Sequence, residues 1–208
     1  PDTASQAFAD DFIQWQWGKS VRLTQRGARA SDESKWGPDE MATIHSVTLG
    51  VTIDKEQTPA LYKLIYRTVY TCDKSTFAAK NKYMRTRPFA QFNEHTWGRY
   101  DDEEYLRGNG SYPSGHTAMG WSVSLVLAEA VPELQDPVLK RGYEYGESRV
   151  IVGAHYQSDV DAGYMCASAA VARMHATEEF AKDLAAARAE YLKLKGLSEK
   201  TPVSAAYP

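Results

Sequence analysis

The sequence predicts an all-α fold, a helical bundle that forms a single domain over residues 1–208. Amphipathic spacing recurs wherever periodicity can be judged, and proline and N-capping residues mark several helix starts. No alternating strand pattern of comparable length competes. A chain of 208 residues is long enough to bury about 70% of the surface that its unfolded form exposes, so one domain with one core is the expectation.

Two helices are predicted in the first part of the chain. Amphipathic spacing favours a helix from Asp10 to about Val21. A second helix begins at Thr58-Pro59, where a threonine N-cap precedes proline at the first helical position.

A third helix is expected from about Lys74 to Arg85. It stops near Arg87 because the residue before Pro88 is pushed out of the helical region. Lys80 and Arg87 would then lie about two turns apart on one face, near 10 Å along the axis if the helix continued. Their side chains would converge only on something large and anionic, and a phosphate fits.

Residues 89–112 form the longest irregular stretch, rich in turn residues and carrying an acidic run, Asp101-Asp102-Glu103-Glu104. A loop of this length is often a lid or a substrate wall, whereas the simpler interpretation is a solvated acidic surface. The sequence leaves both open, and it leaves open whether Tyr105, Glu104 or Phe92 contacts a leaving group.

Further helices are predicted in the second half. One opens at Ser114-Gly115-His116, and the next runs from Asp136-Pro137 toward Arg149. Residues 159–175 form a helix of apolar and small residues suited to close packing. The last begins at its N-cap Thr177 and ends near Gly196.

Composition narrows the class of protein. Lys and Arg number 24 against 27 Asp and Glu, and the interspersed signs and net charge of −3 argue against a nucleic-acid polymer as partner. No apolar run reaches the roughly 18 residues that span a bilayer, so no membrane partner is expected. Cys72 and Cys166 allow at most one disulfide; unpaired thiols are favoured, and no paired-cysteine metal site exists.

Cationic residues and one helix start make a candidate phosphate site. Phosphoryl transfer mainly needs positioning and stabilisation of charge on the equatorial oxygens. Lys80, Arg87 and Arg149 supply cations. At the start of a helix, unpaired N–H groups and a partial positive charge favour anions, so Gly115 offers a close backbone amide and Ser114 a hydroxyl. The ordinary alternative is a serine N-cap followed by glycine.

Two histidines are the candidate catalytic groups. His155 is the best nucleophile because Asp159, four residues later, would lie one helical turn along and accept a hydrogen bond from one ring nitrogen. His116 remains as general acid, protonating a departing alkoxide and later deprotonating the attacking water. His45, His95 and His175 lack a comparable partner pattern and receive no role. The predicted catalytic residues are therefore His155, His116 and Asp159.

Three blocks in fixed order carry a family resemblance: Lys80-x6-Arg87-Pro88, Pro113-Ser114-Gly115-His116 and Ser148-Arg149-x5-His155-x3-Asp159. Together they resemble the signature of the type 2 phosphatidic acid phosphatase superfamily. The surrounding strings KYMRTRPF, NGSYPSGHTA and GESRVIVGAHYQSDVDAGY resemble bacterial class A non-specific acid phosphatases. The likeness covers roughly residues 45–175, and three ordered blocks are far more specific than one short motif.

The resemblance implies an all-helical bundle of the acid phosphatase and vanadium haloperoxidase type. It implies broad, metal-independent hydrolysis of small phosphomonoesters through a phosphohistidine, with phosphotransfer to alcohols as a side reaction. No cofactor is required, although phosphate, or vanadate as an inhibitor or mimic, would bind. The family's roles fall on the same residues: phosphate binders at Lys80, Arg87, Ser114, Gly115 and Arg149, general acid at His116, nucleophile at His155 and orienting carboxylate at Asp159.

The resemblance also implies a periplasmic or secreted location and a homo-oligomer, and the first residues show no basic or apolar signal segment. Residues 1–45 and the tail after Thr177 carry no signature, so they are expected to set oligomerisation or substrate access. Trp15 and Trp17 would form either an interface or, the favoured interpretation, part of the core.

Three other functions share these residues. A vanadate-dependent haloperoxidase uses a similar cage, although this chain lacks the extra sequence associated with those enzymes. A membrane lipid phosphatase shares the blocks but needs transmembrane spans. A non-catalytic oxyanion-binding module would not require an acid and an oriented nucleophile.

Overall fold

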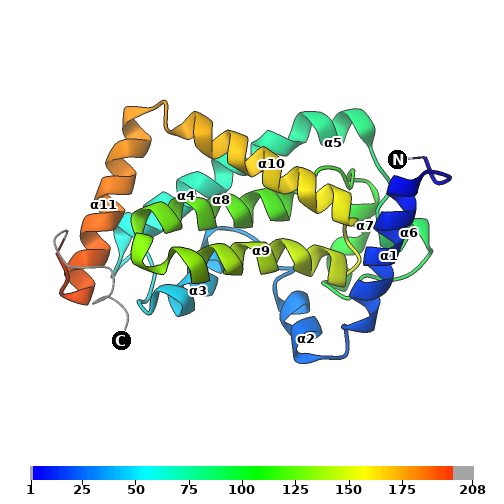
Figure 1. Cartoon of the computed structure of the whole chain (residues 1–208), viewed down its shortest axis with the longest axis horizontal. Helices are drawn as coiled ribbons and strands as arrows, with labels where there is room; N and C mark the ends of the chain where they lie inside the picture. The colour runs from blue at the N-terminus through cyan, green and yellow to red at the C-terminus, as the bar shows by residue number, and fades with distance from the viewer. Residues whose placement is uncertain (1, 199–208) are drawn as a thin grey trace.

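The chain folds into packed helices, described by a computed structural model for residues 2–198 (Figure 1). No strand occurs within that range, so the predicted all-α class is confirmed. The helices are α1 (Gln6–Ser20), α2 (Gln25–Asp32), α3 (Pro38–Leu49), α4 (Pro59–Asp73), α5 (Phe77–Tyr83), α6 (Pro88–Gln91), α7 (Glu103–Arg107), α8 (Gly115–Ala130), α9 (Gln135–Ile151), α10 (Gln157–Met174) and α11 (Glu178–Lys195). Short 3-10 turns precede α5, α7 and α9 at Lys74–Thr76, Tyr100–Asp102 and Pro132–Leu134.

Helix α8 is the centre of the bundle, with α4, α9 and α10 packed around it (Figure 1). Close approach needs glycine on two sides. A Cβ at Gly120 would lie 2.2 Å from the ring of Tyr145 on α9, and one at Gly163 of α10 would lie 2.8 Å from the Ser114 carbonyl oxygen. The core between these helices is aliphatic and almost fully buried, with Leu61, Ile65, Val123 and Val126 among its members.

The predicted helix starts are mostly confirmed. Ser114 caps α8 by accepting a hydrogen bond from the Thr117 N–H, and Thr177 caps α11 by accepting from the Phe180 N–H. Gly196 ends α11 in the left-handed conformation. Helix α1 starts earlier than expected because the Ser5 hydroxyl caps it.

Thr58 precedes α4 as predicted, but its side chain does not cap that helix. Its hydroxyl accepts from the Asp54 N–H at 2.8 Å and so organises the preceding loop. The carboxylate of Glu190 on α11 caps α4 instead, accepting from the N–H groups of Ala60 and Leu61 at 3.2 and 2.8 Å. A long-range cap has therefore replaced the local one.

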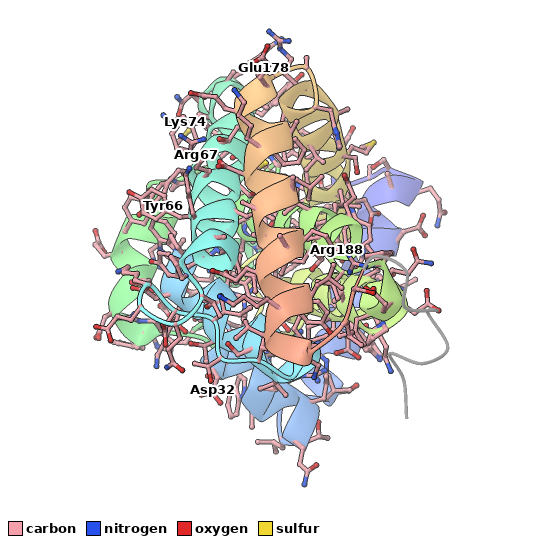
Figure 2. All side chains as sticks on the ribbon, turned by 90° about the vertical axis from the view of Figure 1, so that its left-hand side faces the viewer. Asp32, Tyr66, Arg67, Lys74, Glu178 and Arg188 are labelled. Carbon is pink, nitrogen blue, oxygen red and sulfur yellow. The ribbon has the colours of Figure 1, made fainter. Side chains whose placement is uncertain are left out.

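Helices α4 and α11 lie side by side at one end of the bundle (Figure 2). Arg67 of α4, labelled there, donates to the buried Asp183 of α11 at 2.6 Å. Arg188 forms a bidentate pair with Glu133 at 2.7 and 2.5 Å. These contacts attach α11 to the bundle at the end opposite α1 (Figure 1).

The N-terminal helices α1 and α2 cover the other end, where α1 contacts α9 and α10 and α2 contacts α9. Trp15 is buried and stacks on Phe92 with ring centroids 4.1 Å apart, which supports the core interpretation for that residue. Trp17 remains 39% exposed. Within residues 2–198, no helix combines the length and apolar composition needed to cross a bilayer.

Candidate active site

The three predicted cations meet at one cavity of about 310 Å³. Lys80 comes from α5, Arg87 from the residue before α6 and Arg149 from the last turn of α9. All three are buried and line that cavity. Together with the first turn of α8 they are called the anion cage below.

The cage holds positive charge that no nearby carboxylate pairs directly. Lys80 donates to the Gly110 carbonyl at 2.8 Å, and Arg149 to the Ala30 carbonyl at 3.1 Å. Arg87 donates to the carbonyl oxygens of Leu106, Asn109 and Ala154, each at 3.0 Å. Among the described residues, no Asp or Glu lies within ion-pair distance of these cations, and the buried Nε of Arg149 has no hydrogen-bond partner. An oxyanion would satisfy both deficits.

Burial shifts the titration of these cations. It lowers the pKa of Lys80 to about 7, and the neighbouring Arg87 charge adds to the effect. Burial likewise lowers the pKa of Arg87 to about 10 and depresses the pKa of Arg149. A bound phosphate dianion would reverse these shifts by favouring the charged forms.

The helix expected from about Lys74 to Arg85 is shorter than predicted, so Lys80 and Arg87 do not lie two turns apart on one helical face. Helix α5 ends at Tyr83 because Met84 adopts a left-handed conformation, with φ of 41°, and returns its N–H to the Lys80 carbonyl. Arg87 is extended, with φ of −74° and ψ of 152°. The turn at Met84, rather than a shared helical face, aims both side chains at one cavity.

The first turn of α8 meets the cage from another side. Gly115 lines the cavity, and a Cβ there would approach the Lys80 side chain at 3.7 Å, so the backbone is open to a ligand. Ser114 is fully buried behind this wall, and its oxygen accepts from the Thr117 hydroxyl at 2.9 Å. Its hydroxyl acts as the helix cap, and Gly115 offers the amide.

His155 presents one ring nitrogen to the cage. Its Nε2 lies 3.0 Å from NH1 of Arg87. A guanidinium only donates, so Nε2 accepts and carries the lone pair, while Nδ1 carries the proton. Burial and the Arg87 charge lower the pKa of His155 to about 3, which keeps this imidazole neutral over most of the acidic range.

Asp159 lies near His155, but not through the helical spacing that was expected. His155 precedes α10, and Asp159 is in the first turn of that helix, where its Oδ2 accepts from the Tyr156 N–H at 2.9 Å. The distance from Nδ1 of His155 to Oδ2 of Asp159 is 3.7 Å, too long for a hydrogen bond. The contact depends on the turn at residues 155–156 instead of on one helical face.

Two residues around Asp159 were missed in the sequence. Ser111 donates to Oδ2 of Asp159 at 2.5 Å, and Arg85 donates to Oδ1 at 2.6 Å. Burial alone would raise the pKa of Asp159, but His155, Arg85 and Ser111 together hold it at about 2. Arg85 is one of the unspecified positions inside the first block, and Ser111 lies in the irregular segment just before the second block. No periodicity or spacing distinguishes either residue.

His116 is fixed by the N-terminal part of the chain. Its Nε2 lies 3.1 Å from the Ser34 carbonyl oxygen, which only accepts, so Nε2 carries a proton. Glu33, buried beside Ser34, accepts from the hydroxyl of Ser148 and from Arg141, which ties this segment to α9. Residues 1–45, which carry no motif, therefore build part of the site.

Burial strongly lowers the pKa of His116, and the charges of Arg149 and a protonated His155 would lower it further. These effects favour the neutral imidazole. A bound dianion opposes these effects and favours protonation, because it places negative charge beside the ring.

The 89–112 segment is a cavity wall with short helices of its own, so it is less irregular than expected. Helix α7 and most of helix α6 form within it, and Glu103 accepts from the Thr96 N–H at 2.8 Å. Tyr105 lines the cavity, whereas Glu104 and Phe92 do not. This segment also lines the cavity with Thr96, Arg99, Asp102 and Asn109, and Trp36 and Phe77 line it from elsewhere in the chain.

The residues given no role lie elsewhere. His45 is buried near Ser124, and His95 and His175 contact Glu103 and Glu129. Cys72 and Cys166 are free thiols, as favoured, although Cys166 is only partly buried. No cluster of three or more potential metal ligands occurs within residues 2–198.

This geometry defines a class: an all-helical protein with a cationic oxyanion cage between two histidines. Residues 61–181 match the sequence model of the PAP2 superfamily, and the chain belongs to that superfamily. It is 44% identical to a non-specific acid phosphatase of Providencia stuartii over 94% of this chain and 79% of the relative. A non-specific acid phosphatase of Salmonella typhimurium is 40% identical over 91% of this chain and 76% of the relative. An acid phosphatase of Zymomonas mobilis is 35% identical over 97% of this chain and 76% of its own length.

Within the superfamily, the chain is a class A acid phosphatase. The assignment of enzyme class rests on relatives named non-specific acid phosphatase or acid phosphatase, which are similar over most of the chain.

Proposed function

We propose that the protein hydrolyses small phosphate monoesters with broad specificity, without a metal ion, through a phosphohistidine on His155. One observation carries the proposal: the neutral His155 directs its lone-pair nitrogen at the cage, 3.0 Å from Arg87. A lone-pair nitrogen beside three buried cations is what an attack on a bound phosphoryl group requires.

Substrate binding comes first. The phosphate oxygens take hydrogen bonds from Lys80, Arg87 and Arg149 and from the amide at Gly115, and the free Nε of Arg149 gains its missing partner. The three side chains supply the charge that a metal ion provides in other phosphatases, which supports metal independence. Vanadate, with similar shape and charge, would occupy the same place.

Attack follows. Nε2 of His155 forms a bond to phosphorus as the bond from phosphorus to the leaving oxygen breaks, and that electron pair leaves with the oxygen. His116, protonated beside the bound dianion, gives its proton to the leaving group from Nδ1, since Nε2 is held by the Ser34 carbonyl.

Hydrolysis regenerates the site. His116, now neutral at Nδ1, takes a proton from water as the water oxygen attacks phosphorus and the bond to His155 breaks. An alcohol in place of water gives phosphotransfer by the same step. The wall contributes aromatic, cationic and anionic side chains, which supports broad specificity for the leaving group.

The single domain over residues 1–208, the periplasmic or secreted location and the homo-oligomer stay predictions. The haloperoxidase alternative requires vanadate as a resident cofactor, and bromide oxidation with added vanadate and peroxide tests it.

The decisive experiment compares wild type with His155→Ala from about pH 4 to about pH 9 in the presence of EDTA. We expect hydrolysis that needs no metal ion and that His155→Ala reduces by at least about 10³-fold. We also expect an acid-labile phosphoprotein that can be trapped only in wild type. His175→Ala is the control, because that side chain is 46% exposed and lies outside the cavity. Hydrolysis that survives in His155→Ala, or that EDTA abolishes, contradicts the proposal.

A further inference from the structure

We propose that Ser111 is a positioning residue that connects the imidazole of His155 to the carboxylate of Asp159. The inference rests on the proposed function, in which His155 is the nucleophile. It assigns a third member to a pair that sequence spacing treats as a direct contact.

The protonation of His155 is fixed by its partners. Arg87 donates to Nε2, so the ring proton is on Nδ1 and needs an acceptor. Two oxygens lie near Nδ1: the hydroxyl of Ser111 at 3.3 Å and Oδ2 of Asp159 at 3.7 Å. Only the first lies within hydrogen-bonding range.

The Ser111 hydroxyl has one proton, and it uses this proton to donate a hydrogen bond to the Asp159 carboxylate. The distance from Ser111 Oγ to Asp159 Oδ2 is 2.5 Å, typical of a hydroxyl donating to an ionised carboxylate. The lone pairs of the hydroxyl then accept from Nδ1 of His155. His155 thus donates to Ser111, and Ser111 donates to Asp159, so the direction of both hydrogen bonds is fixed.

The surroundings hold this arrangement in place. The Ser111 N–H donates to the Arg85 carbonyl at 2.8 Å, which fixes the serine backbone. Asp159 also accepts from the Tyr156 N–H and from Arg85, so rotation toward His155 would break hydrogen bonds already made. The carboxylate acts on the ring through the serine.

Ser111 does not contact substrate in this arrangement. Its side chain is fully buried and does not line the cavity, unlike Lys80, Arg87 and Gly115. Its effect on the reaction therefore passes through His155, and phosphate binding is independent of it.

The serine matters when the ring becomes charged. As Nε2 bonds to phosphorus, Nδ1 keeps its proton and the imidazole becomes cationic. The Ser111 oxygen, polarised by Asp159, stabilises this cation, and no proton passes to the carboxylate. The leaving group receives its proton from His116, so charge and atoms balance without Ser111 changing protonation state.

The test uses Ser111→Ala and Ser111→Cys. Cysteine keeps the approximate shape of serine but is a weak acceptor and donor, so it removes the connection with less risk to folding. We expect either folded variant to lower kcat and the rate of phosphoprotein formation on the order of 10- to 100-fold while KM stays within about 2-fold. Ser122→Ala is the matched control, because Ser122 is also fully buried and donates to a backbone carbonyl, that of Met119 at 2.9 Å.

A spectroscopic measurement separates positioning from general damage to the structure. In the free enzyme, the hydrogen-bonded Nδ1 proton of His155 should give a downfield proton NMR signal that is absent in His155→Ala. We expect Ser111→Cys to shift or lose this signal and Ser122→Ala to leave it unchanged.

Two kinetic results overturn the proposal: a folded Ser111 variant whose kcat stays within about 2-fold of wild type, or one whose KM alone changes. An unchanged downfield signal in Ser111→Cys also overturns it. If wild type forms no phosphoprotein, the proposed mechanism fails, whereas the signal in the free enzyme still decides whether Ser111 holds the ring.

Discussion

Arg87 lies directly against the nitrogen of His155 that faces the cage, with NH1 3.0 Å from Nε2. The guanidinium therefore donates a hydrogen bond to the nitrogen whose lone pair the proposed attack uses. A phosphate that draws NH1 onto its own oxygens would free the nitrogen at the same moment that it places phosphorus beside it. In the proposed mechanism, this side chain would couple substrate binding to activation of the nucleophile.

Arg87→Gln tests that coupling. Because the Arg87 charge helps to lower the pKa of His155, its removal should raise that pKa and move the acidic limb of kcat/KM to higher pH. We also expect kcat/KM to fall on the order of 10³-fold from the lost charge on the phosphate. The pH profile of the variant checks both effects, and an acidic limb that stays at the wild-type position would refute the electrostatic part.

Lys80 should set an upper pH limit for substrate capture. The pKa of Lys80 is about 7, so the side chain is charged below that pH and loses its charge above it. We expect kcat/KM to decline above about pH 7, with less effect on kcat because a bound dianion raises the pKa again.

Lys80→Arg is the matching variant, since arginine stays charged throughout this range. The decline near pH 7 should disappear in Lys80→Arg, whatever its effect on the absolute rate. Persistence of the same alkaline limb would assign it to another group.

The cations illustrate what the sequence could predict and what it could not. Lys80, Arg87 and Arg149 were recognised from block spacing, and the helix that begins at Ser114 from its capping residue. The turn at Met84 was not predictable, because no glycine or asparagine marks the left-handed position there.

The parts of the site that were missed depend on contacts distant in sequence. Ser34 reaches His116 across 82 residues, and Ser111 reaches Asp159 across 48. One partner in each contact is an ordinary serine in an irregular segment, so only tertiary packing reveals that it meets His116 or Asp159. The helical repeat of the sequence predicts on which face of a helix a side chain lies, whereas these contacts depend on tertiary packing.

His45 should make the fold sensitive to acid. Burial and the Arg141 charge lower the pKa of His45 to about 3, whereas an unfolded histidine titrates near 6.5. Below about pH 6.5 the unfolded state therefore binds a proton that the folded state does not bind. The unfolding free energy decreases as the pH is lowered, until the pKa of the folded state is reached. The contribution of one such group is about 1.4 kcal/mol per pH unit within that window.

His45→Gln removes this titration, so its unfolding free energy should depend less steeply on pH between about 6 and about 4 than that of wild type. Urea unfolding at several pH values measures the difference. His175→Gln, on the surface, should retain the wild-type slope. Equal slopes for His45→Gln and wild type would show that His45 is not the source.

Asp11 of α1 should act at a distance on the active site through Arg85. The carboxylate of Asp11 accepts from Arg85 at 2.7 Å and from the N–H and hydroxyl of Ser158 at 2.8 and 2.6 Å, and the same Arg85 donates to Asp159. Asp11 is buried, so Asp11→Ala leaves buried donors of Arg85 and Ser158 without this acceptor. We therefore expect the unfolding free energy to decrease by about 1–3 kcal/mol. Arg85 would also lose one of the two carboxylates that orient it, so kcat should fall with little change in KM.

The neighbouring Asp10→Ala is the control, because Asp10 is exposed and its carboxylate accepts only from Gln6 of the same helix among its hydrogen bonds with described residues. Urea unfolding and steady-state kinetics on both variants separate the two roles. A variant Asp11→Ala that loses stability but keeps kcat would limit α1 to holding the bundle together. Loss of kcat at a temperature where the variant is fully folded would instead establish that α1 orients Asp159 through Arg85, since no atom of Asp11 lines the cavity.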